Sequence, residues 1–214
     1  MNDKCVEDKC MNDKWLDFAI RIQSIAQAGL QYGKDPYDKE RYEELRQISA
    51  EMISLKTDIP TEKIHDLFCN ETGYQTPKID TRAAVFVNDK ILLVHENNGT
   101  WSLPGGWCDE GETIRSNTKK EAWEESGLSV DPYRIVALDS QQKRNRPANF
   151  YGVCKVFVLC RVLGGEFQPN IETSERRYFP LTDLPPLILG KQNPEQIWMC
   201  YQAYRAREWE PRFD

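Results

Sequence analysis

The sequence lacks several features that would assign it to common classes of protein. No apolar run reaches the roughly 20 residues of a membrane-spanning helix, and the polar, mixed-charge N-terminus is unlike a secretory signal. The formal net charge is −6, which disfavours a general nucleic-acid-binding surface. The seven cysteines are odd in number, and none pairs at zinc-site spacing. We therefore expect a protein of the reducing cytoplasm.

The hydrophobic pattern changes along the chain. The 214 residues, 40% of them hydrophobic, are enough for a medium domain with a smaller companion. Apolar residues first recur at three- and four-residue steps, which predicts helices, and later form short runs, which predict strands. We expect a helical domain over residues 1–72 with a polar tail over 1–12, a linker over 73–79, and a second domain over 80–214.

The polar tail contains a repeat. Met1-Asn2-Asp3-Lys4 recurs as Met11-Asn12-Asp13-Lys14. Either an extension precedes an original start at Met11, or the repeat is a coincidence. In both cases we expect no function for residues 1–12.

Three helices are expected in the first domain. The first begins at Trp15, the second begins near Tyr37, and the third begins at Pro60-Thr61 with Thr61 as its N-cap. Such short helices bury little surface alone, so we expect them to pack on a neighbouring domain or to pair across a dimer. The predicted buried faces are Tyr42, Leu45, Ile48, Met52 and Leu55 on the second helix, and Ile64, Leu67 and Phe68 on the third.

The second domain opens with a hairpin that turns at Asn88-Asp89. Strands follow at 134–138, at 153–162 and at 178–179, and the second of these is so continuously apolar that both of its faces should be buried. The last helix should begin after Asn193, with Pro194 in its first turn and Gln196 completing a capping box.

Six carboxylate side chains are concentrated between Asp109 and Glu125. Glu121, Glu124 and Glu125 fall at helical spacing and share one face, where like charges cost roughly 0.2–0.5 kcal/mol per pair. A bound cation would neutralise them, and ligation by oxygen alone suits Mg²⁺ or Mn²⁺. The alternative is a solvated helix face.

The same segment, from Gly106 to Leu128, reads G-x5-E-x7-K-E-A-x-E-E-x-G-L. It resembles the Nudix box, G-x5-E-x7-R-E-U-x-E-E-x-G-U, in which U is a bulky aliphatic residue. Lys120 replaces the family's Arg, and Ala122 replaces the larger aliphatic residue. The resemblance implies a Nudix hydrolase with the family's α/β/α sandwich and mixed sheet. Such enzymes cleave a nucleoside diphosphate linked to another moiety, X.

Other segments are similar to a bacterial Nudix subgroup with an N-terminal helical domain. They include Trp15-Leu16, the junction at 80–86, the segment 101–107 and the tail segment from Glu172 to Leu187. The subgroup includes CDP-choline pyrophosphatases and ADP-ribose-type pyrophosphatases. This resemblance implies cleavage of such a nucleotide to a nucleoside monophosphate and phospho-X, and it implies a homodimer.

The resemblance also implies roles for individual residues. The general base would be a box glutamate, Glu121 or Glu124, or a glutamate on a later loop, where we prefer Glu175 to Glu172. Lys120 would pair with Glu112, more loosely than Arg because it lacks the bidentate fork. The metal ligands would be the Gly106 carbonyl, Glu121, Glu124 and Glu125, and the structural residues of the box would be Glu112, Lys120 and Gly127.

Substrate contacts are harder to place. Lys143, Arg144 and Arg146 form a locally basic loop that would hold phosphate, or would simply be solvated. Arg82 would face the substrate or form a surface ion pair. The aromatic residues Trp101, Phe150 and Tyr151 would stack on a base or belong to the core.

Two other functions are compatible with the sequence. One is hydrolysis of damaged nucleoside triphosphates or of RNA ends, which the basic loop allows and the acidic balance opposes. The other is a non-catalytic Nudix ligand sensor whose helical leader binds DNA. Sensors of that kind usually lose box carboxylates, whereas this chain retains them, and its leader shows no basic recognition face.

Overall fold

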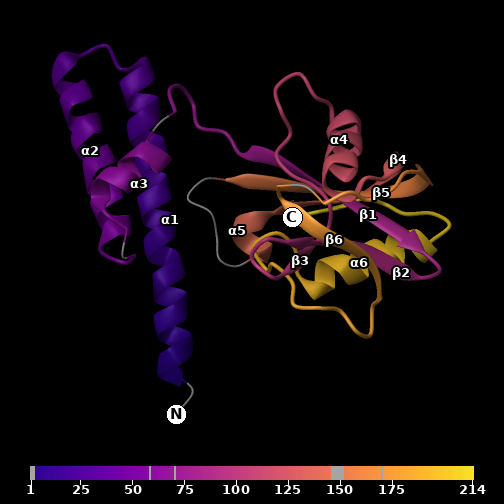
Figure 1. Ribbon diagram of the computed structural model, residues 1–214. Coiled ribbons are helices and arrows are strands. Elements are labelled where there is room, and N and C mark those ends of the chain that lie inside the picture. The colour runs from indigo at the N-terminus through magenta and orange to yellow at the C-terminus, as the bar shows by residue number, and fades with distance from the viewer. Residues whose placement is uncertain (1–2, 58, 70, 146–151, 170) are drawn as a thin grey trace. The chain divides into compact units, whose positions relative to one another are not determined.

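The computed structural model describes residues 3–57, 59–69, 71–145, 152–169 and 171–214, with side chains from residue 14 onward except 67 and 68. The chain divides into two compact units, residues 1–76 and 77–214 (Figure 1). The boundary falls inside the predicted linker, 73–79. Within these described ranges, no helix has both the length and the apolar character to cross a membrane.

The first unit is all helical: α1 (Asp3–Tyr32), α2 (Pro36–Ser54) and α3 (Thr61–Phe68). Asp35 caps α2 by accepting the backbone N–H groups of Tyr37 and Asp38. Helices α1 and α2 run antiparallel, and Ser49 Oγ donates to the Ala19 carbonyl at 2.7 Å. Gly29 permits this close packing, because a Cβ there would lie 2.4 Å from the Tyr42 ring.

Some details of the first unit differ from the sequence prediction. Helix α1 extends back to Asp3, since neither Pro nor Gly interrupts the polar tail. The N-cap prediction for Thr61 was wrong: Thr61 is the first helical residue of α3, and Pro60 precedes it. The predicted face of α2 was also partly wrong, because Ser49, Ala50 and Ile53 are buried, whereas Ile48 and Leu55 are 40% and 79% exposed. The small side chains of Ser49 and Ala50 let α1 approach α2. The predicted residues Leu67 and Phe68 lie outside the described side chains.

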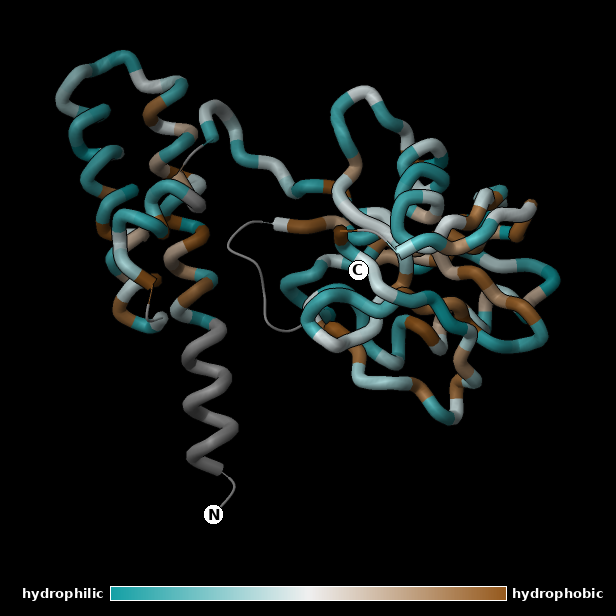
Figure 2. The backbone as a smooth tube through the Cα atoms, viewed as in Figure 1, coloured by the Kyte–Doolittle hydropathy of each residue, from teal (hydrophilic) through white to brown (hydrophobic). Residues whose placement is uncertain are grey.

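The second unit is built on one mixed sheet. The strand order is β3-β2-β1-β5-β4-β7, and β6 pairs with β2. Strand β1 runs parallel to β5 and antiparallel to β2. The strands of this sheet carry most of the hydrophobic segments of the second unit, and polar loops surround them (Figure 2). The strands are β1 (Lys78–Val87), β2 (Lys90–Glu96), β3 (Trp101–Ser102), β4 (Ser129–Ser140), β5 (Val153–Gly164), β6 (Thr173–Pro180) and β7 (Arg212–Phe213).

The predicted hairpin and last helix are confirmed. Asn88 and Asp89 have φ angles of 50° and 60°, as a two-residue turn of left-handed residues requires. Helix α6 (Pro194–Arg205) begins after Asn193, which forms a capping box with Gln196. Both features depend on neighbouring residues alone, which explains why the sequence predicted them.

Helices cover both faces of the sheet. Helix α6 packs Ile197, Cys200 and Ala203 into one hydrophobic cluster. Helix α4 (Ile114–Ser126), which carries the box, packs the fully buried Ala122 into a second cluster on the other face. A short helix, α5 (Gln141–Arg144), follows β4. The expected α/β/α sandwich, preceded by a small helical domain, is confirmed.

Candidate active site

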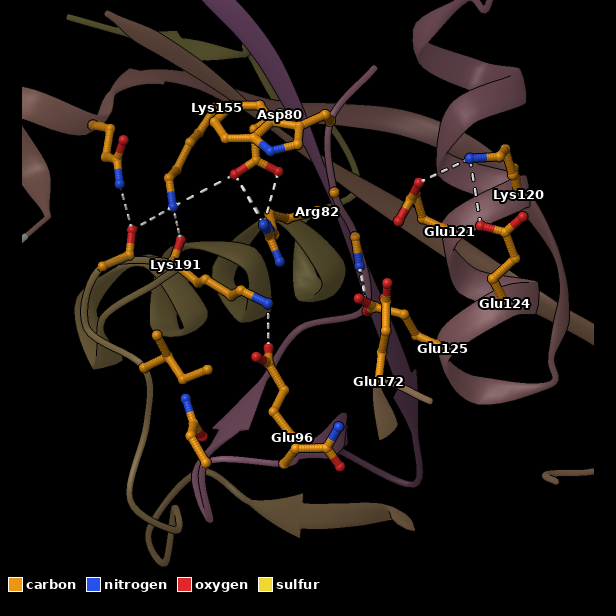
Figure 3. Close-up of a pocket in the computed structure, with 18 of the residues that line it drawn as sticks. Asp80, Arg82, Glu96, Lys120, Glu121, Glu124, Glu125, Lys155, Glu172 and Lys191 are labelled. Atoms are coloured by element: carbon orange, nitrogen blue, oxygen red, sulfur yellow. Dashed lines mark hydrogen bonds and ion pairs between the residues drawn. The ribbon is translucent and has the colours of Figure 1, made fainter. Parts of the chain in front are cut away.

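A cavity of about 1060 Å³ opens beside the box helix in the second unit. Its size is typical of a pocket for a small-molecule ligand. Carboxylates of α4 line one part, and basic side chains of β1, β5 and the loop before α6 line another (Figure 3). The cavity therefore brings two oppositely charged groups of side chains together.

The acidic part includes three glutamates within about one turn of α4, Glu121, Glu124 and Glu125. Glu121 and Glu125 are 9% and 5% exposed, whereas the Glu124 side chain is 53% exposed. Glu125 Oε2 accepts the Gly105 N–H at 2.8 Å. A Cβ on Gly106 would lie 2.6 Å from Glu121 Oε2, so a larger residue there would displace the Glu121 carboxylate from its present position.

We had expected Lys120 to pair with Glu112, but its contacts are with other carboxylates. Its ammonium group contacts Asp109 at 3.0 Å, Glu121 at 3.3 Å and Glu124 at 3.4 Å. The hydrogen bond that Lys120 donates to the Asp109 carboxylate is the chief cause that raises the pKa of Lys120, so the side chain stays charged. Glu112 is exposed in the loop before α4, while the i, i+4 spacing places Glu124 beside Lys120.

Burial disfavours the charged forms of Glu121 and Glu125, the two buried glutamates of α4. It raises the pKa of Glu121, against the attraction of Lys120. It raises the pKa of Glu125 to about 7, although Arg82 and the Gly105 N–H act in the opposite direction. A cation at this position would relieve that cost.

The donor atoms of this region fit a hard divalent ion. Within the described part of the chain, no three His, Cys, Asp or Glu side chains converge on one point. Instead, the Lys120 ammonium lies 3.3 Å from Glu121 and 3.4 Å from Glu124 and offsets part of their negative charge. The surrounding groups are carboxylates and backbone carbonyls, the ligands that Mg²⁺ and Mn²⁺ prefer. The Gly106 carbonyl also accepts the Thr81 N–H at 2.9 Å, and a carbonyl oxygen has a second lone pair.

The basic part begins with Arg82 on β1, which lines the cavity and is 4% exposed. Its guanidinium pairs with Asp80 at 2.9 Å and donates to the Leu103 carbonyl at 3.3 Å. The alternative of a surface ion pair is therefore wrong, because this pair is buried. The Asp80 carboxylate binds the guanidinium group of Arg82 and orients it within the cavity wall.

Lys155 on β5 and Lys191 before α6 also line the cavity, and we had not singled them out. Lys155 is 1% exposed, donates to the Gly190 carbonyl at 2.8 Å and lies 3.6 Å from Asp80. Burial lowers its pKa to about 7. A lysine inside an apolar strand is a signal that could have indicated Lys155, because buried charges are retained where they have partners. No local pattern marks Lys191.

Two of the three residues of the basic loop that we had considered for phosphate binding can be placed. Lys143 and Arg144 are exposed and do not line the cavity, because α5 turns Gln141 inward instead. Arg144 lies 3.7 Å from the carboxylate of Asp214. Arg146 lies outside the described residues.

The aromatic residues predicted to stack on a base or to belong to the core can be placed in part. Trp101 belongs to the core, where its ring centroid lies 4.9 Å from His95 and 4.7 Å from Phe179. Phe150 and Tyr151 lie outside the described residues. Trp107, next to the box glycine, lines the cavity and is 43% exposed, so it is the aromatic side chain available there among the described residues.

The structure favours Glu172 over Glu175 as a cavity residue. Glu172 lines the cavity beside Glu125 (Figure 3). Glu175 lies on β6, outside the cavity lining, and pairs with Arg177. Residues two apart on a strand share a face, which explains this pair. The identity of the general base stays a prediction, and of the two later glutamates it is Glu172 that lines the cavity.

Gly127, the last glycine of the box, ends α4 with a φ of 65°. A left-handed C-cap favours glycine, and a Cβ here would lie 2.2 Å from the Glu166 carbonyl oxygen. Its role is therefore structural, since it allows the chain to leave the box helix.

Comparisons with known proteins agree with this architecture. Residues 77–199 match the NUDIX domain family, and residues 13–68 match a family described as UDP-X-like, N-terminal oligomerisation domain. YjhB of Bacillus subtilis strain 168, provisionally named an ADP-ribose pyrophosphatase, is 43% identical over 202 residues, which cover 94% of this chain and 97% of that protein.

Two solved structures are also similar. An ADP-ribose pyrophosphatase from Streptococcus suis 89-1591 is 55% identical and covers 65% of this chain and 100% of its own, with a TM-score of 0.62. A UDP-X diphosphatase is 29% identical and covers 95% of this chain and 99% of its own, also with a TM-score of 0.62. The chain therefore belongs to the Nudix hydrolase family and is an enzyme of that family.

Proposed function

We propose that this enzyme hydrolyses the diphosphate of nucleoside diphosphate-X compounds of the ADP-ribose type, releasing a nucleoside monophosphate and phospho-X. The observation that carries this proposal is the cavity in which Glu121, Glu124 and Glu125 face Arg82 and Lys191. Carboxylates suit a divalent ion, and cations suit phosphoryl oxygens. The ADP-ribose pyrophosphatase names of its relatives support the choice of substrate.

Glu121, Glu124, Glu125 and the Gly106 carbonyl would hold Mg²⁺ or Mn²⁺. When bound, such an ion screens the charge of the diphosphate and lowers the pKa of water. The protein's own groups orient the substrate and take up a proton. Water attacks one phosphorus atom, the bond from that phosphorus to the bridging oxygen breaks, and the proton passes to a carboxylate.

We propose Glu172 as the general base, because it lines the cavity next to Glu125. Replacing Glu172 with glutamine should lower kcat by about 10²–10⁴-fold, the usual contribution of general base catalysis. Glu175→Gln is the matched control on the same segment and should retain nearly full activity. Steady-state kinetics at saturating Mg²⁺ measure both variants. A larger loss of activity in Glu175→Gln would contradict the assignment.

A substrate panel tests the proposed function directly. The protein is incubated with Mg²⁺ and ADP-ribose, CDP-choline, a UDP-sugar, nucleoside triphosphates or short RNA, and products are identified by mass spectrometry. We expect the highest kcat/KM for ADP-ribose. CDP-choline is the second candidate, because Trp107 and the cavity carboxylates offer a surface for a quaternary ammonium group. Faster cleavage of triphosphates would overturn the assignment.

We also propose that the helical unit holds the enzyme as a homodimer. The match of residues 13–68 to an oligomerisation domain supports this proposal. So do large apolar side chains that stay exposed on α1, including Phe18 at 50% and Ile25 at 60%, since such surface favours association. Sedimentation velocity should give twice the mass of the 24.9 kDa chain; a monomer at micromolar concentration would rule the proposal out.

A further inference from the structure

Lys191 lies on a rigid loop at the cavity wall, in a position that the box pattern does not include. Gln141 Nε2 and Lys155 Nζ donate to the neighbouring Gly190 carbonyl at 2.9 and 2.8 Å, and Lys155 also bonds the Lys191 carbonyl. The next residue, Gln192, is fully buried and accepts the Leu103 N–H at 3.2 Å. These buried contacts fix the backbone that carries the lysine side chain.

The ammonium group of Lys191 is far less constrained than its backbone. Among the described residues, its ion pair is with Glu96 at the end of β2, and the Lys191 side chain is 33% exposed. The head groups of Arg82 and Lys155 are instead held by Asp80 and by backbone carbonyls. Of the three cations in the basic part of the cavity, Arg82, Lys155 and Lys191, Lys191 is therefore the one that can change partner most readily. Glu96 would keep its hydrogen bond from Ser102 Oγ if Lys191 moved away.

The orientation of Lys191 connects it to the catalytic end of the cavity. Its side chain extends toward the opening that Glu125 and Glu172 also face (Figure 3). It lies close enough to the box to be one of the cations that oppose the burial-raised pKa of Glu125. A backbone held by buried contacts that carries a partly exposed cation is a preorganised site for an anionic group.

We propose that Lys191 binds phosphoryl oxygens of the substrate's diphosphate and leaves Glu96 when the substrate enters. This inference rests on the proposed function, because it assigns a further substrate-binding residue to the same reaction. Glu96 is then the partner that holds the lysine in place while the cavity contains no nucleotide. The binding is charge-assisted and contributes mainly to substrate affinity.

The test compares Lys191→Met, Lys191→Arg and Glu96→Gln with the matched control Lys90→Met, which changes an exposed lysine at the other end of β2. Lys191→Met should raise KM for ADP-ribose about 10- to 100-fold, the value of one hydrogen bond to a charged group, with a smaller change in kcat. Lys191→Arg should restore most of the affinity. Glu96→Gln should leave KM equal to or below that of the wild type, and Lys90→Met should change neither constant.

Two results would overturn the proposal. The first is an unchanged KM in Lys191→Met. The second is an equal loss of activity and of thermal stability in Lys191→Met and Glu96→Gln, because that result would make the ion pair a structural latch. Calorimetric binding of the α,β-methylene analogue of ADP-ribose separates this proposal from the proposed function. If the wild type binds the analogue but cleaves no panel substrate, the proposed function fails, while the affinity of Lys191→Met still decides the role of Lys191.

Discussion

Replacing Glu125 with glutamine should abolish turnover and, without divalent ions, make the protein more stable at pH 8. Glu125 is 5% exposed, and burial raises its pKa to about 7. An amide of the same shape avoids the cost of burying a negative charge at pH 8. A shift from 4.5 to about 7 corresponds to about 3 kcal/mol. Activity should fall by at least about 10³-fold, because a proposed metal ligand is lost.

The pH dependence has a definite sign. Because the folded-state pKa of Glu125 is raised, the folded protein binds more protons than the unfolded chain between about pH 4.5 and 7. The stabilisation of the protonated form is complete below about pH 4.5 and is lost as the pH rises to about 7. Urea unfolding in EDTA at pH 5 and pH 8 should therefore show a smaller fall in stability for Glu125→Gln than for the wild type.

Added Mg²⁺ should make the wild type more stable than Glu125→Gln at pH 8. The ion stabilises the folded state that binds it, and the variant lacks one of the proposed ligands. Glu110→Gln, which changes an exposed carboxylate in the loop before α4, is the control and should behave like the wild type. A Glu125→Gln protein that keeps full turnover would refute the metal assignment. A variant that loses turnover but keeps a ligand-dependent response would instead favour the sensor alternative.

Asp80→Asn should destabilise the folded enzyme by about 3–5 kcal/mol, the usual cost of breaking a buried ion pair by removing one partner. Asp80 is 4% exposed, pairs with Arg82 at 2.9 Å and lies 3.6 Å from Lys155. Without its carboxylate, two buried cations would remain with no negative partner between them. Urea unfolding at pH 6 measures this loss.

The loss should decrease at higher pH. Burial already lowers the pKa of Lys155 to about 7, and removal of Asp80 would lower it further. Because the folded state binds fewer protons than the unfolded chain above that pKa, stability rises with pH until the unfolded-state pKa of 10.5 is reached. The defect of Asp80→Asn should therefore be larger at pH 6 than at pH 9.

The matched control for this prediction is Asp89→Asn. Asp89 pairs with Arg205 at 2.9 Å, but both side chains are more than half exposed, so the loss should stay below about 1 kcal/mol. Equal losses for the two variants would show that burial does not determine the value of the Asp80 pair. A loss in Asp80→Asn that does not depend on pH would contradict the role assigned to Lys155.

Local sequence patterns predicted a large part of the second unit. The hairpin turn at Asn88-Asp89 and the capping box of Asn193 and Gln196 form between residues at most three apart. The box helix likewise places Glu121, Glu124 and Glu125 toward one cavity, because helical geometry alone puts such spacings on one face. These features do not require knowledge of how distant segments meet.

Predictions about loop residues succeeded less well. Glu175 was preferred to Glu172, yet Glu175 lies on β6 and pairs with Arg177 two residues along the strand, whereas Glu172 lines the cavity. The basic residues Lys143 and Arg144 drew attention because they are adjacent in the sequence, but α5 exposes both of them. Proximity along the chain is a poor guide where a loop turns.

The sequence by itself determined the box, its helix and the family, because these depend on short, regular spacings. Only the tertiary structure decided the basic part of the cavity. There, Asp80 meets Lys155, and Glu96 meets Lys191, which lies 95 residues further along the chain. Those contacts exist because the sheet pairs β1 with β5 and because buried side chains anchor the loop before α6. The partners are far apart in the sequence and meet only when the sheet and this loop are folded, so no local pattern could have revealed them.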